Sequence, residues 1–297
     1  MPQSDIYNEI EYPGPYQQAW SKFKQNHVSW VCFCIVVFFI FIALVGPFIS
    51  PYSPYHQDTN YVLLPPSWQT AGNVHFLLGT DDLGRDVFSR LIHGTSLTFG
   101  ISLIVAFGAM LAGVTLGALA GMSKGVRSSI FNHLLDAVLS IPSLLLAVVI
   151  VAILGPGLDN TIWAVFLVLV PQFVHRTQIV IRDELKKEYI TAARLDGASD
   201  FHILIHSIFP NTIESIILQY SLAVSAAMLD IAALGFLGLG AQHGSPEWGA
   251  MLADSIDLIY RASWLAILPG ITMFLCLLSV NSVGHGLRNA LKQRSES

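Results

Sequence analysis

The chain alternates long apolar runs with shorter polar connections. A helix that crosses a membrane needs about 20 mostly apolar residues, because it must satisfy its own backbone hydrogen bonds across about 30 Å of hydrocarbon. Six segments meet or approach this requirement: Trp30 to Ile49, Leu97 to Met122, Ile130 to Leu154, Asn160 to Ile181, Asn211 to Leu237 and Trp264 to Leu287. The pattern predicts an all-α polytopic membrane protein with six transmembrane helices.

Positive charge orients these spans. With the N-terminus in the cytoplasm, all but three of the 15 Lys and Arg residues fall on the cytoplasmic side, as the positive-inside rule requires. The exceptions are Arg85, Arg90 and Arg261. We therefore expect both termini in the cytoplasm, and the first apolar run is long enough to be an anchor.

The predicted parts are a cytoplasmic segment (1–29), a first transmembrane helix (30–49), an outer loop (50–96), a five-helix core (97–287) and a cytoplasmic tail (288–297).

Composition narrows the function. Only 12% of residues are charged, against roughly 25% in soluble domains. No basic stripe with interleaved aromatic residues occurs, which argues against nucleic acid as a partner. No phosphate-binding glycine loop and no hydrolase motif occurs, so we expect neither ATP hydrolysis nor other catalysis by this chain. The cysteines Cys32, Cys34 and Cys276 lie in apolar runs and are expected to be small hydrophobic residues, and no metal site is predicted.

The outer loop contains an amphipathic pattern in the sequence Gly79-Thr-Asp-Asp-Leu-Gly-Arg-Asp-Val-Phe-Ser-Arg-Leu-Ile. Thr80 or Asp81 can cap a helix, and acid-to-base pairs stand four residues apart at Asp81 with Arg85 and at Asp86 with Arg90. An apolar stripe is formed by Leu83, Val87, Leu91 and Ile92. We expect an amphipathic helix on the outer membrane face. The alternative is a solvated helix that only connects two spans.

The inner connection at 183–210 reads as a helix, a break and a second helix. Glu184 to Leu195 contains good helix formers, and Gly197 suits the left-handed residue that ends a helix. Ser199 or Asp200 can cap the next helix, and Pro210 fits a first helical turn. The pattern predicts a compact knob outside the membrane.

The composition of this knob suits close contact with another molecule. Ala192 and Ala193 leave the backbone accessible, while Glu188, Arg194 and Asp196 offer directional polar contacts. A docking element closed in a partner's cleft fits these residues. A pair of interfacial helices that rest on lipid fits them equally well.

Four motifs then resemble one family. Residues 188–199 have the form E-Y-x-x-A-A-R-x-x-G-A-S, followed by Pro210-Asn211, and look like the E-A-A loop of binding-protein-dependent ABC transporter permeases of the peptide, dipeptide and nickel type. Similar stretches are the Gly79 motif, Leu234-Gly-Phe-Leu-Gly-Leu-Gly and Pro246-Glu-Trp-Gly. The resemblance covers about residues 20 to 290.

Shorter stretches bear on the branch of the family. Leu229-Asp-Ile-Ala-Ala-Leu-Gly-Phe-Leu and Leu63-Leu-Pro-Pro-Ser-Trp are similar to the C-type permeases of the Sap branch, which is associated with antimicrobial peptides. The chain departs from many relatives at Gln242-His243-Gly244, where they carry Q-P-P. Sap-like systems are linked to peptides, haem and polyamines, so the substrate stays open.

The resemblance implies a type I ABC importer permease in the bacterial inner membrane, with coupling helices that insert into a separate ATPase and a periplasmic amphipathic helix. It implies that ATP and Mg are used by the ATPase subunits, that a second permease and a periplasmic solute-binding protein complete the transporter, and that this chain binds no cofactor. The residues that match the coupling loop are Glu188, Tyr189, Ala192, Ala193, Arg194, Asp196, Gly197, Ala198 and Ser199.

Four acidic residues are candidates for the solute pathway. Asp230 lies 18 residues beyond Thr212, about 27 Å along a core of about 30 Å, and an acid at that depth faces either an aqueous path or a structural partner. Glu247, Asp254 and Asp257 follow in the outer loop. We hypothesise that they form an acidic rim that favours cationic solutes.

Glycine and proline positions predict how the spans pack and bend. Gly113, Gly117 and Gly121 repeat every fourth residue and predict close helix packing. Pro142, Pro171 and Pro269 are expected to kink their spans.

An ion-driven secondary transporter and a membrane scaffold are the alternative functions. The first predicts a relay of intramembrane acids, and the second predicts that Gly197 tolerates substitution.

Overall fold

A computed structural model describes residues 14–123 and 125–295. The remaining residues, namely 1–13 of the predicted N-terminal segment, Lys124 and 296–297, lie outside the described part. The described residues contain no β-strand, only one isolated bridge between Thr80 and Asp86. The elements are α1 (Pro15–Gln25), α2 (His27–Ile49), α3 (Val87–Gly94), η1 (Thr95–Gly100), α4 (Ile101–Met122), α5 (Val126–Leu139), α6 (Ser143–Leu154), α7 (Leu158–Glu184), α8 (Glu188–Leu195), α9 (Asp200–Ile203), η2 (Leu204–Ile208), α10 (Phe209–Phe236), α11 (Trp248–Ser255), η3 (Ile256–Leu258) and α12 (Trp264–Ser295).

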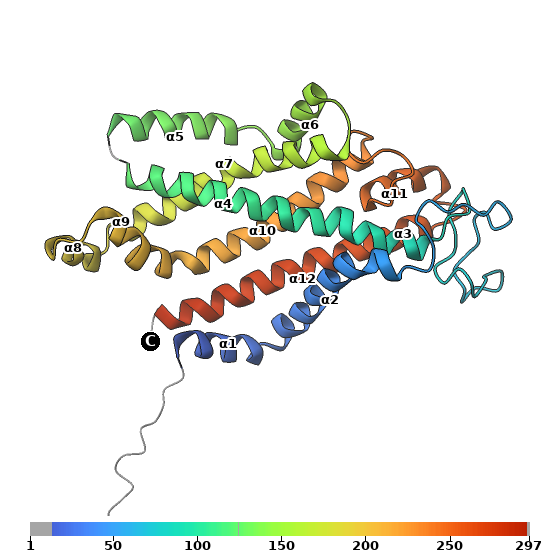
Figure 1. The fold of residues 1–297 in the computed structure, drawn as a ribbon, viewed down its shortest axis with the longest axis horizontal. Coiled ribbons are helices and arrows are strands. Elements are labelled where there is room, and N and C mark those ends of the chain that lie inside the picture. Colours follow the sequence, from blue (N-terminus) through green and yellow to red (C-terminus); the bar gives the residue numbers. More distant parts are fainter. Residues whose placement is uncertain (1–13, 124, 296–297) are drawn as a thin grey trace, which may run out of the picture.

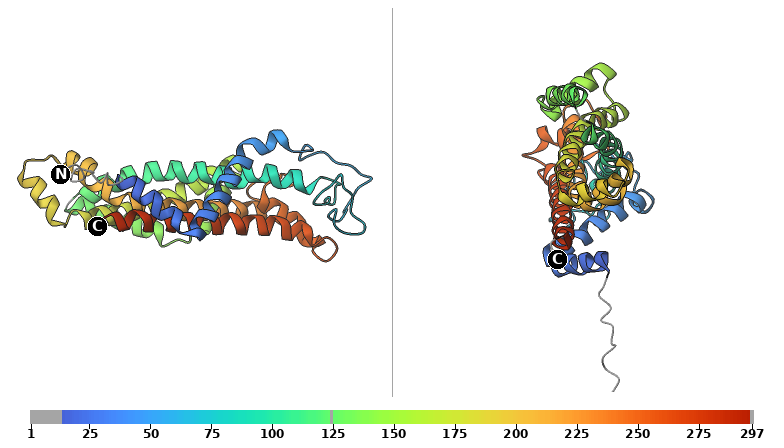
Figure 2. Two further views of the ribbon diagram at one scale, coloured as in Figure 1. Left: turned by 90° about the horizontal axis from the view of Figure 1, so that it is seen from below. Right: turned by 90° about the vertical axis from the view of Figure 1, so that its left-hand side faces the viewer.

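The long helices α2, α4, α7, α10 and α12 run along the long axis of an elongated bundle (Figure 1). Two further views show the same arrangement (Figure 2). At one end lie α8 and α9, together with α1 and the last turns of α12; we call this the knob end. At the other end lie residues 50–86 with α3 and α11; we call this the loop end.

Within residues 14–123 and 125–295, five helical segments are long and apolar enough to cross a membrane: His27–Ile49, Val87–Met122, Leu158–Glu184, Asp200–Phe236 and Trp264–Lys292. The predicted third span is instead a bent pair, because Ser129–Leu139 and Ser143–Leu154 meet at 86°. The break falls at Pro142, as predicted, whereas α7 and α12 continue through Pro171 and Pro269. The six-span prediction holds when the bent pair counts as one span.

The predicted amphipathic helix of the outer loop differs from the structure in start and placement. α3 begins at Val87, and its cap is Asp86, which accepts a hydrogen bond from the Ser89 N–H at 2.8 Å. Residues 79–86 form turns instead, because the Asp81 carboxylate accepts from the N–H groups of Leu83 and Arg85. α3 runs through η1 into α4, and Val87 has no exposed surface. α3 is therefore the buried beginning of a span, and the prediction that it lies on the membrane face is wrong.

The glycine repeat places α4 directly against α7. A Cβ built on Gly113 would lie 2.3 Å from the Phe173 Cβ, and one on Gly117 would lie 2.7 Å from the Thr177 Cβ. A Cβ on Gly121 would lie 3.0 Å from Ile181. The prediction of close helix packing is confirmed, because only glycine permits this approach of the two backbones.

Replacing Gly113 by alanine should lower stability by about 1–3 kcal/mol, because the added methyl group overpacks the α4–α7 contact. The midpoint of thermal unfolding in mild detergent should fall. Gly108→Ala on the same helix is the matched control, since its Cβ would meet its nearest atom, Phe166 Cε2, only at 3.4 Å. Equal midpoints for the two variants would contradict the packing explanation.

Candidate functional site

The predicted helix, break and helix of the inner connection are present. α7 ends at Glu184, a short turn follows, and α8 begins at Glu188 instead of Glu184. Gly197 has φ +84°, the left-handed conformation that the sequence predicted. Ser199 caps α9 by accepting from the His202 N–H at 3.3 Å, and Pro210 lies in the first turn of α10. We call residues 188–203 the knob.

One phenol group ties the knob to both adjoining spans. The Tyr189 hydroxyl donates a short hydrogen bond to Glu184, at the end of α7, and accepts one from the Asn211 side-chain amide at 3.1 Å, at the start of α10. Lys187 Nζ lies 2.8 Å from the Glu184 carboxylate, which is almost fully buried. We call Glu184, Lys187, Tyr189 and Asn211 the tyrosine clamp.

The protonation state of the clamp follows from its surroundings. Partial desolvation of the phenol, reinforced by the hydrogen bond to Glu184, raises the pKa of Tyr189 to about 12. The contribution of this protonated phenol to stability is therefore complete below its ordinary pKa of about 10 and is lost only as the pH rises through about 12. At neutral pH the phenol donates to the Glu184 carboxylate.

A small apolar core supports the knob from within. Ile190 and Ile203 have no exposed surface and pack in one cluster with Ala118 of α4, Ile181 of α7 and Ile208 of η2. The knob is thus attached to three spans, α4, α7 and α10, and a displacement of the knob would be transmitted to all of them.

The outer surface of the knob exposes apolar side chains that sequence reasoning did not single out. Leu195 is 84% exposed and Phe201 is 74% exposed. Their position on a helix-turn-helix segment beyond the spans was the available signal. Of the predicted coupling residues, Ala193 and Ala198 are half-buried, and the others are exposed: Glu188, Tyr189, Ala192, Arg194, Asp196, Gly197 and Ser199. Gly197 has open space around it, so its requirement for glycine is conformational.

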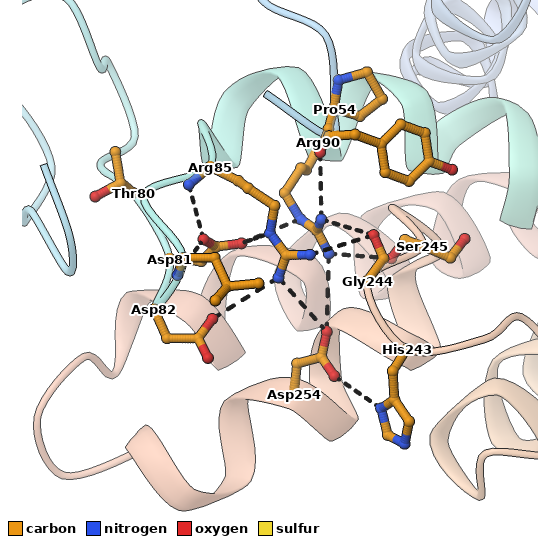
Figure 3. A network of polar contacts seen from close by, with 12 residues as sticks. Pro54, Thr80, Asp81, Asp82, Arg85, Arg90, His243, Gly244, Ser245 and Asp254 are labelled. Carbon is orange, nitrogen blue, oxygen red and sulfur yellow. Dashed lines mark hydrogen bonds and ion pairs between the residues drawn. The ribbon is translucent and has the colours of Figure 1, made fainter. Parts of the chain in front are cut away.

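Charged groups close the loop end (Figure 3). Arg85 Nε lies 2.6 Å from the Asp81 carboxylate, which confirms that predicted pair. Arg90 does not pair with Asp86 as predicted; it donates to the carbonyls of Gly244 at 3.0 Å and Ser245 at 3.1 Å. Both arginines also approach Asp254, at 4.0 and 3.9 Å. We call Asp81, Arg85, Arg90 and Asp254 the loop-end clamp, which joins the Gly79 motif to the segment before α11.

The predicted acidic rim is wrong for Glu247. Its side chain has no exposed surface, accepts from the N–H groups of Gly249 and Ala250 at 2.9 and 2.8 Å, and accepts from the Thr98 hydroxyl at 2.8 Å. Burial raises the pKa of Glu247. Glu247 therefore caps α11 inside the protein. The adjacent Trp248 is also buried, and its indole N–H donates to the Leu91 carbonyl at 3.2 Å.

The other candidate acids have different surroundings. Asp254 is engaged by the two arginines and by His243 Nδ1 at 3.1 Å. Asp257 is exposed and pairs with no cation in the described part of the chain. Asp230 is buried in α10, and its Oδ2 has no hydrogen-bond partner among the described residues. A direct role of Asp230 in the solute pathway stays a prediction.

Residues 14–123 and 125–295 contain no group of three His, Cys, Asp or Glu side chains that could hold a metal ion. The cysteines are free, with Cys32 and Cys276 buried and Cys34 exposed on α2.

Two protein-family models match the chain. Residues 113–296 match the binding-protein-dependent transport system inner membrane component, and residues 14–66 match the N-terminal transmembrane domain of oligopeptide transport permease C.

Individual proteins agree with this match. The chain is 46% identical to the peptide transport system permease protein SapC of Escherichia coli O6:H1, over 98% of both chains. It is 44% identical to the di/tripeptide transport system permease protein DppC of Pseudomonas aeruginosa, over 95% of this chain and 93% of the relative. A chain of the MetNI methionine ABC transporter in an inward-facing conformation shares the fold, with a TM-score of 0.57 and 16% identity over 69% of this chain and 97% of that one. The predicted type I importer fold is confirmed.

Tyr189→Phe should loosen the knob without unfolding the bundle, because it leaves the buried Glu184 with Lys187 alone. Losing one such hydrogen bond costs about 1 kcal/mol, so amide hydrogen exchange in α8 should accelerate about fivefold while α4 exchanges as before. Glu188→Gln, an exposed neighbour, is the control. Unchanged exchange in the phenylalanine variant would show that the clamp does not hold α8.

Proposed function

The chain belongs to the family of binding-protein-dependent transport system inner membrane components, and from this membership we propose that it is a permease subunit of an ATP-driven peptide importer, coupled to a separate ATPase through the knob. The peptide assignment draws on the names of its relatives. In this proposal ATP and Mg are used by the ATPase subunits, a second permease chain forms the other half of the pathway, and a periplasmic solute-binding protein delivers the solute to the loop end.

The exposed apolar surface of the knob carries the coupling proposal. Burying a leucine or phenylalanine side chain contributes about 1.5–3 kcal/mol, and Leu195 and Phe201 stay largely uncovered within this chain. They stand on a segment that its own core and the tyrosine clamp hold in one orientation. A rigid apolar projection of this kind is what an anchor in a partner's groove requires.

Mechanism follows from the attachments of the knob. Closure of the ATPase subunits would displace the knob, and the tyrosine clamp would pass that displacement to the ends of α7 and α10. The apolar cluster that contains both Ile190 and Ala118 would pass it to α4. The loop end, closed by its own clamp, would keep its shape while the knob end opens and closes.

The charge distribution supports a bacterial inner-membrane topology with a cytoplasmic knob end. Lys186, Lys187 and Arg194 lie on or beside the knob. At the loop end, Arg85 and Arg90 are buried in ion pairs and therefore do not act as free positive charges. This asymmetry of exposed positive charge supports the proposal that both termini lie on the cytoplasmic side.

A preference for cationic solutes depends on fewer acids than the sequence suggested. Glu247 is internal and Asp254 is engaged by two arginines, which leaves Asp257 as the exposed member of the predicted rim. Asp257→Asn should lower uptake of trilysine relative to trialanine about twofold, as expected for an exposed charge. Glu247→Gln should leave the ratio unchanged when uptake is normalised to membrane protein. An unchanged ratio in the asparagine variant would refute the cationic preference.

Gly197→Val should separate this chain from its ATPase while the spans stay folded. A β-branched residue at φ +84° is strained, yet no atom lies within 4 Å of the added Cβ, so the damage is confined to the turn. The amount of ATPase that co-purifies from native membranes should fall at least tenfold. Gly197→Asn should retain more ATPase, since asparagine tolerates this conformation.

The control for this experiment is Gly270→Val, in α12, where open space surrounds the glycine and φ is not positive. Retention of the ATPase by Gly197→Val would favour the scaffold. Transport by the purified chain alone would favour an ion-driven secondary transporter.

A further inference from the structure

An open groove separates the first turn of α2 from the knob-end part of α12. Its volume of about 450 Å³ lies within the usual range for ligand sites, about 300–1,000 Å³. The two helices touch beside it, since a Cβ built on Gly286 would lie 2.4 Å from the Ser29 hydroxyl. The groove is lined by Val28 and Ser29 of α2 and by Leu278, Ser282, His285 and Asn289 of α12, with a few further residues.

The groove crosses the edge of the apolar part of both helices. Along α12, Leu278 lies 14 residues and Asn289 lies 25 residues beyond Trp264, which is about 21 Å and about 38 Å of helix. A hydrocarbon core of about 30 Å that begins at Trp264 ends between these two residues. On α2 the same edge lies between the cap Asn26 and the first apolar residue, Val28. One end of the groove is therefore apolar and the other polar, at the level where acyl chains meet headgroups.

Hydrogen-bond donors in the groove have no acceptor within the described part of the chain. Ser29 is only 4% exposed, and its hydroxyl makes no hydrogen bond there. The Asn26 side chain accepts from the Ser29 N–H at 3.2 Å, and the N–H of Val28, in the first turn of the 23-residue α2, has no intrahelical partner. Across the groove, the exposed side chains of His285 and Asn289 also lack hydrogen bonds to the described residues. These donors suit an anion with several oxygens, such as a phosphodiester.

The surroundings of the groove carry positive charge. Within their described bounds α1, α2 and α12 contain no Asp or Glu. Lys22 and Lys24 are exposed on α1, which packs on α12, and Arg288 lies on α12. Lys24 Nζ lies 5.3 Å from the Trp20 ring centroid and 5.4 Å from that of Trp30, and tryptophans beside basic residues are typical of a membrane–water interface. The site therefore favours an anionic headgroup over a zwitterionic one.

We propose that this groove binds an anionic glycerophospholipid from the leaflet at the knob end. Its phosphate accepts from the Ser29 hydroxyl and the Val28 N–H, at the positive end of the α2 dipole, while His285 and Asn289 hold the headgroup from α12. An acyl chain runs past Leu278 along the exposed apolar surface of α2. A soluble phosphate ester would leave that apolar end uncovered, so the groove as a whole fits a lipid.

A lipid in this groove would join its two walls. The direct contact of α2 with α12 at Ser29 and Gly286 would be extended by headgroup hydrogen bonds to both helices. The first span, together with α1, would thereby be held against α12. This inference goes beyond the importer function and requires only that the bundle crosses a membrane, so it is independent of the solute and of the ATPase.

The test titrates phosphatidylglycerol into the purified full-length chain in mild detergent and counts bound lipid by native mass spectrometry. Ser29→Ala and Asn289→Ala should each raise the dissociation constant of the tightest-bound lipid about tenfold, the effect of losing one hydrogen bond to a charged group. Both replacements only remove atoms, and Asn289 is exposed, so the fold should persist. Gln25→Ala, which removes an exposed amide at the same end but outside the groove, should bind the lipid as the wild type does.

A second readout locates the lipid and identifies its headgroup. Phosphatidylglycerol that carries a diazirine in its acyl chain should label the peptide that contains Leu278, and Ser29→Ala should reduce this labelling. Phosphatidylcholine should bind about fivefold more weakly, the effect of about one basic residue near a membrane surface. Glycerol 3-phosphate should not displace the bound lipid.

Three results would overturn the proposal. Equal binding by Ser29→Ala, Asn289→Ala and Gln25→Ala would show that the lipid lies elsewhere around the spans. Equal binding of phosphatidylcholine would show that the groove does not select an anionic headgroup, and displacement by glycerol 3-phosphate would show a site for soluble phosphate esters. None of these results bears on the importer function, for which the Gly197 variants still decide the coupling.

Discussion

The hydroxyl of Tyr189 is the constraint on which the arrangement of the knob depends. Glu184 ends α7 as a buried carboxylate, and a buried charge must be paired and hydrogen-bonded to be tolerated. Its partners, Lys187 and Tyr189, come from the next few residues, and Tyr189 is held in turn by Asn211 at the start of α10. The chain therefore turns sharply after α7, and α8 folds back so that Ile190 is covered. Leu195 then faces outward.

The two ends of the bundle differ in how completely their side chains are satisfied within the chain. At the loop end, Arg85 and Arg90 are satisfied by Asp81, Asp254 and the carbonyls of Pro54, Gly244 and Ser245, so few of their donors remain free (Figure 3). At the knob end, two large apolar side chains, Leu195 and Phe201, stay exposed. In the proposed function the loop end keeps its shape and the knob end is where the ATPase acts. This division of labour agrees with an importer permease, in which energy enters from the cytoplasm.

Local chemistry explains which parts could be predicted from the sequence. Long apolar runs predict spans because hydrocarbon allows few alternatives, and Gly197, Ser199 and Pro210 predict the knob because each acts through its own backbone or side chain. The failures lie where distant segments decide. Asp81 binds nearby N–H groups and Asp86 caps α3, so the charge spacing of the Gly79 motif did not describe one surface helix. From the sequence, Glu247 was expected to be exposed, but in the fold it is buried beside Trp248 and bonded to Thr98. The break at Pro142 was predicted, but its angle of 86° and the exposure of Leu195 were not.

Photochemical cross-linking from position 195 tests the coupling claim most directly. A benzophenone amino acid in place of Leu195, activated in intact native membranes, should give an adduct that mass spectrometry identifies as an ATPase subunit. The same probe in place of Leu83, an exposed residue at the loop end, should give none. An adduct at position 195 with lipid alone would contradict the account, because it would show that the knob rests on the membrane surface and does not engage a partner.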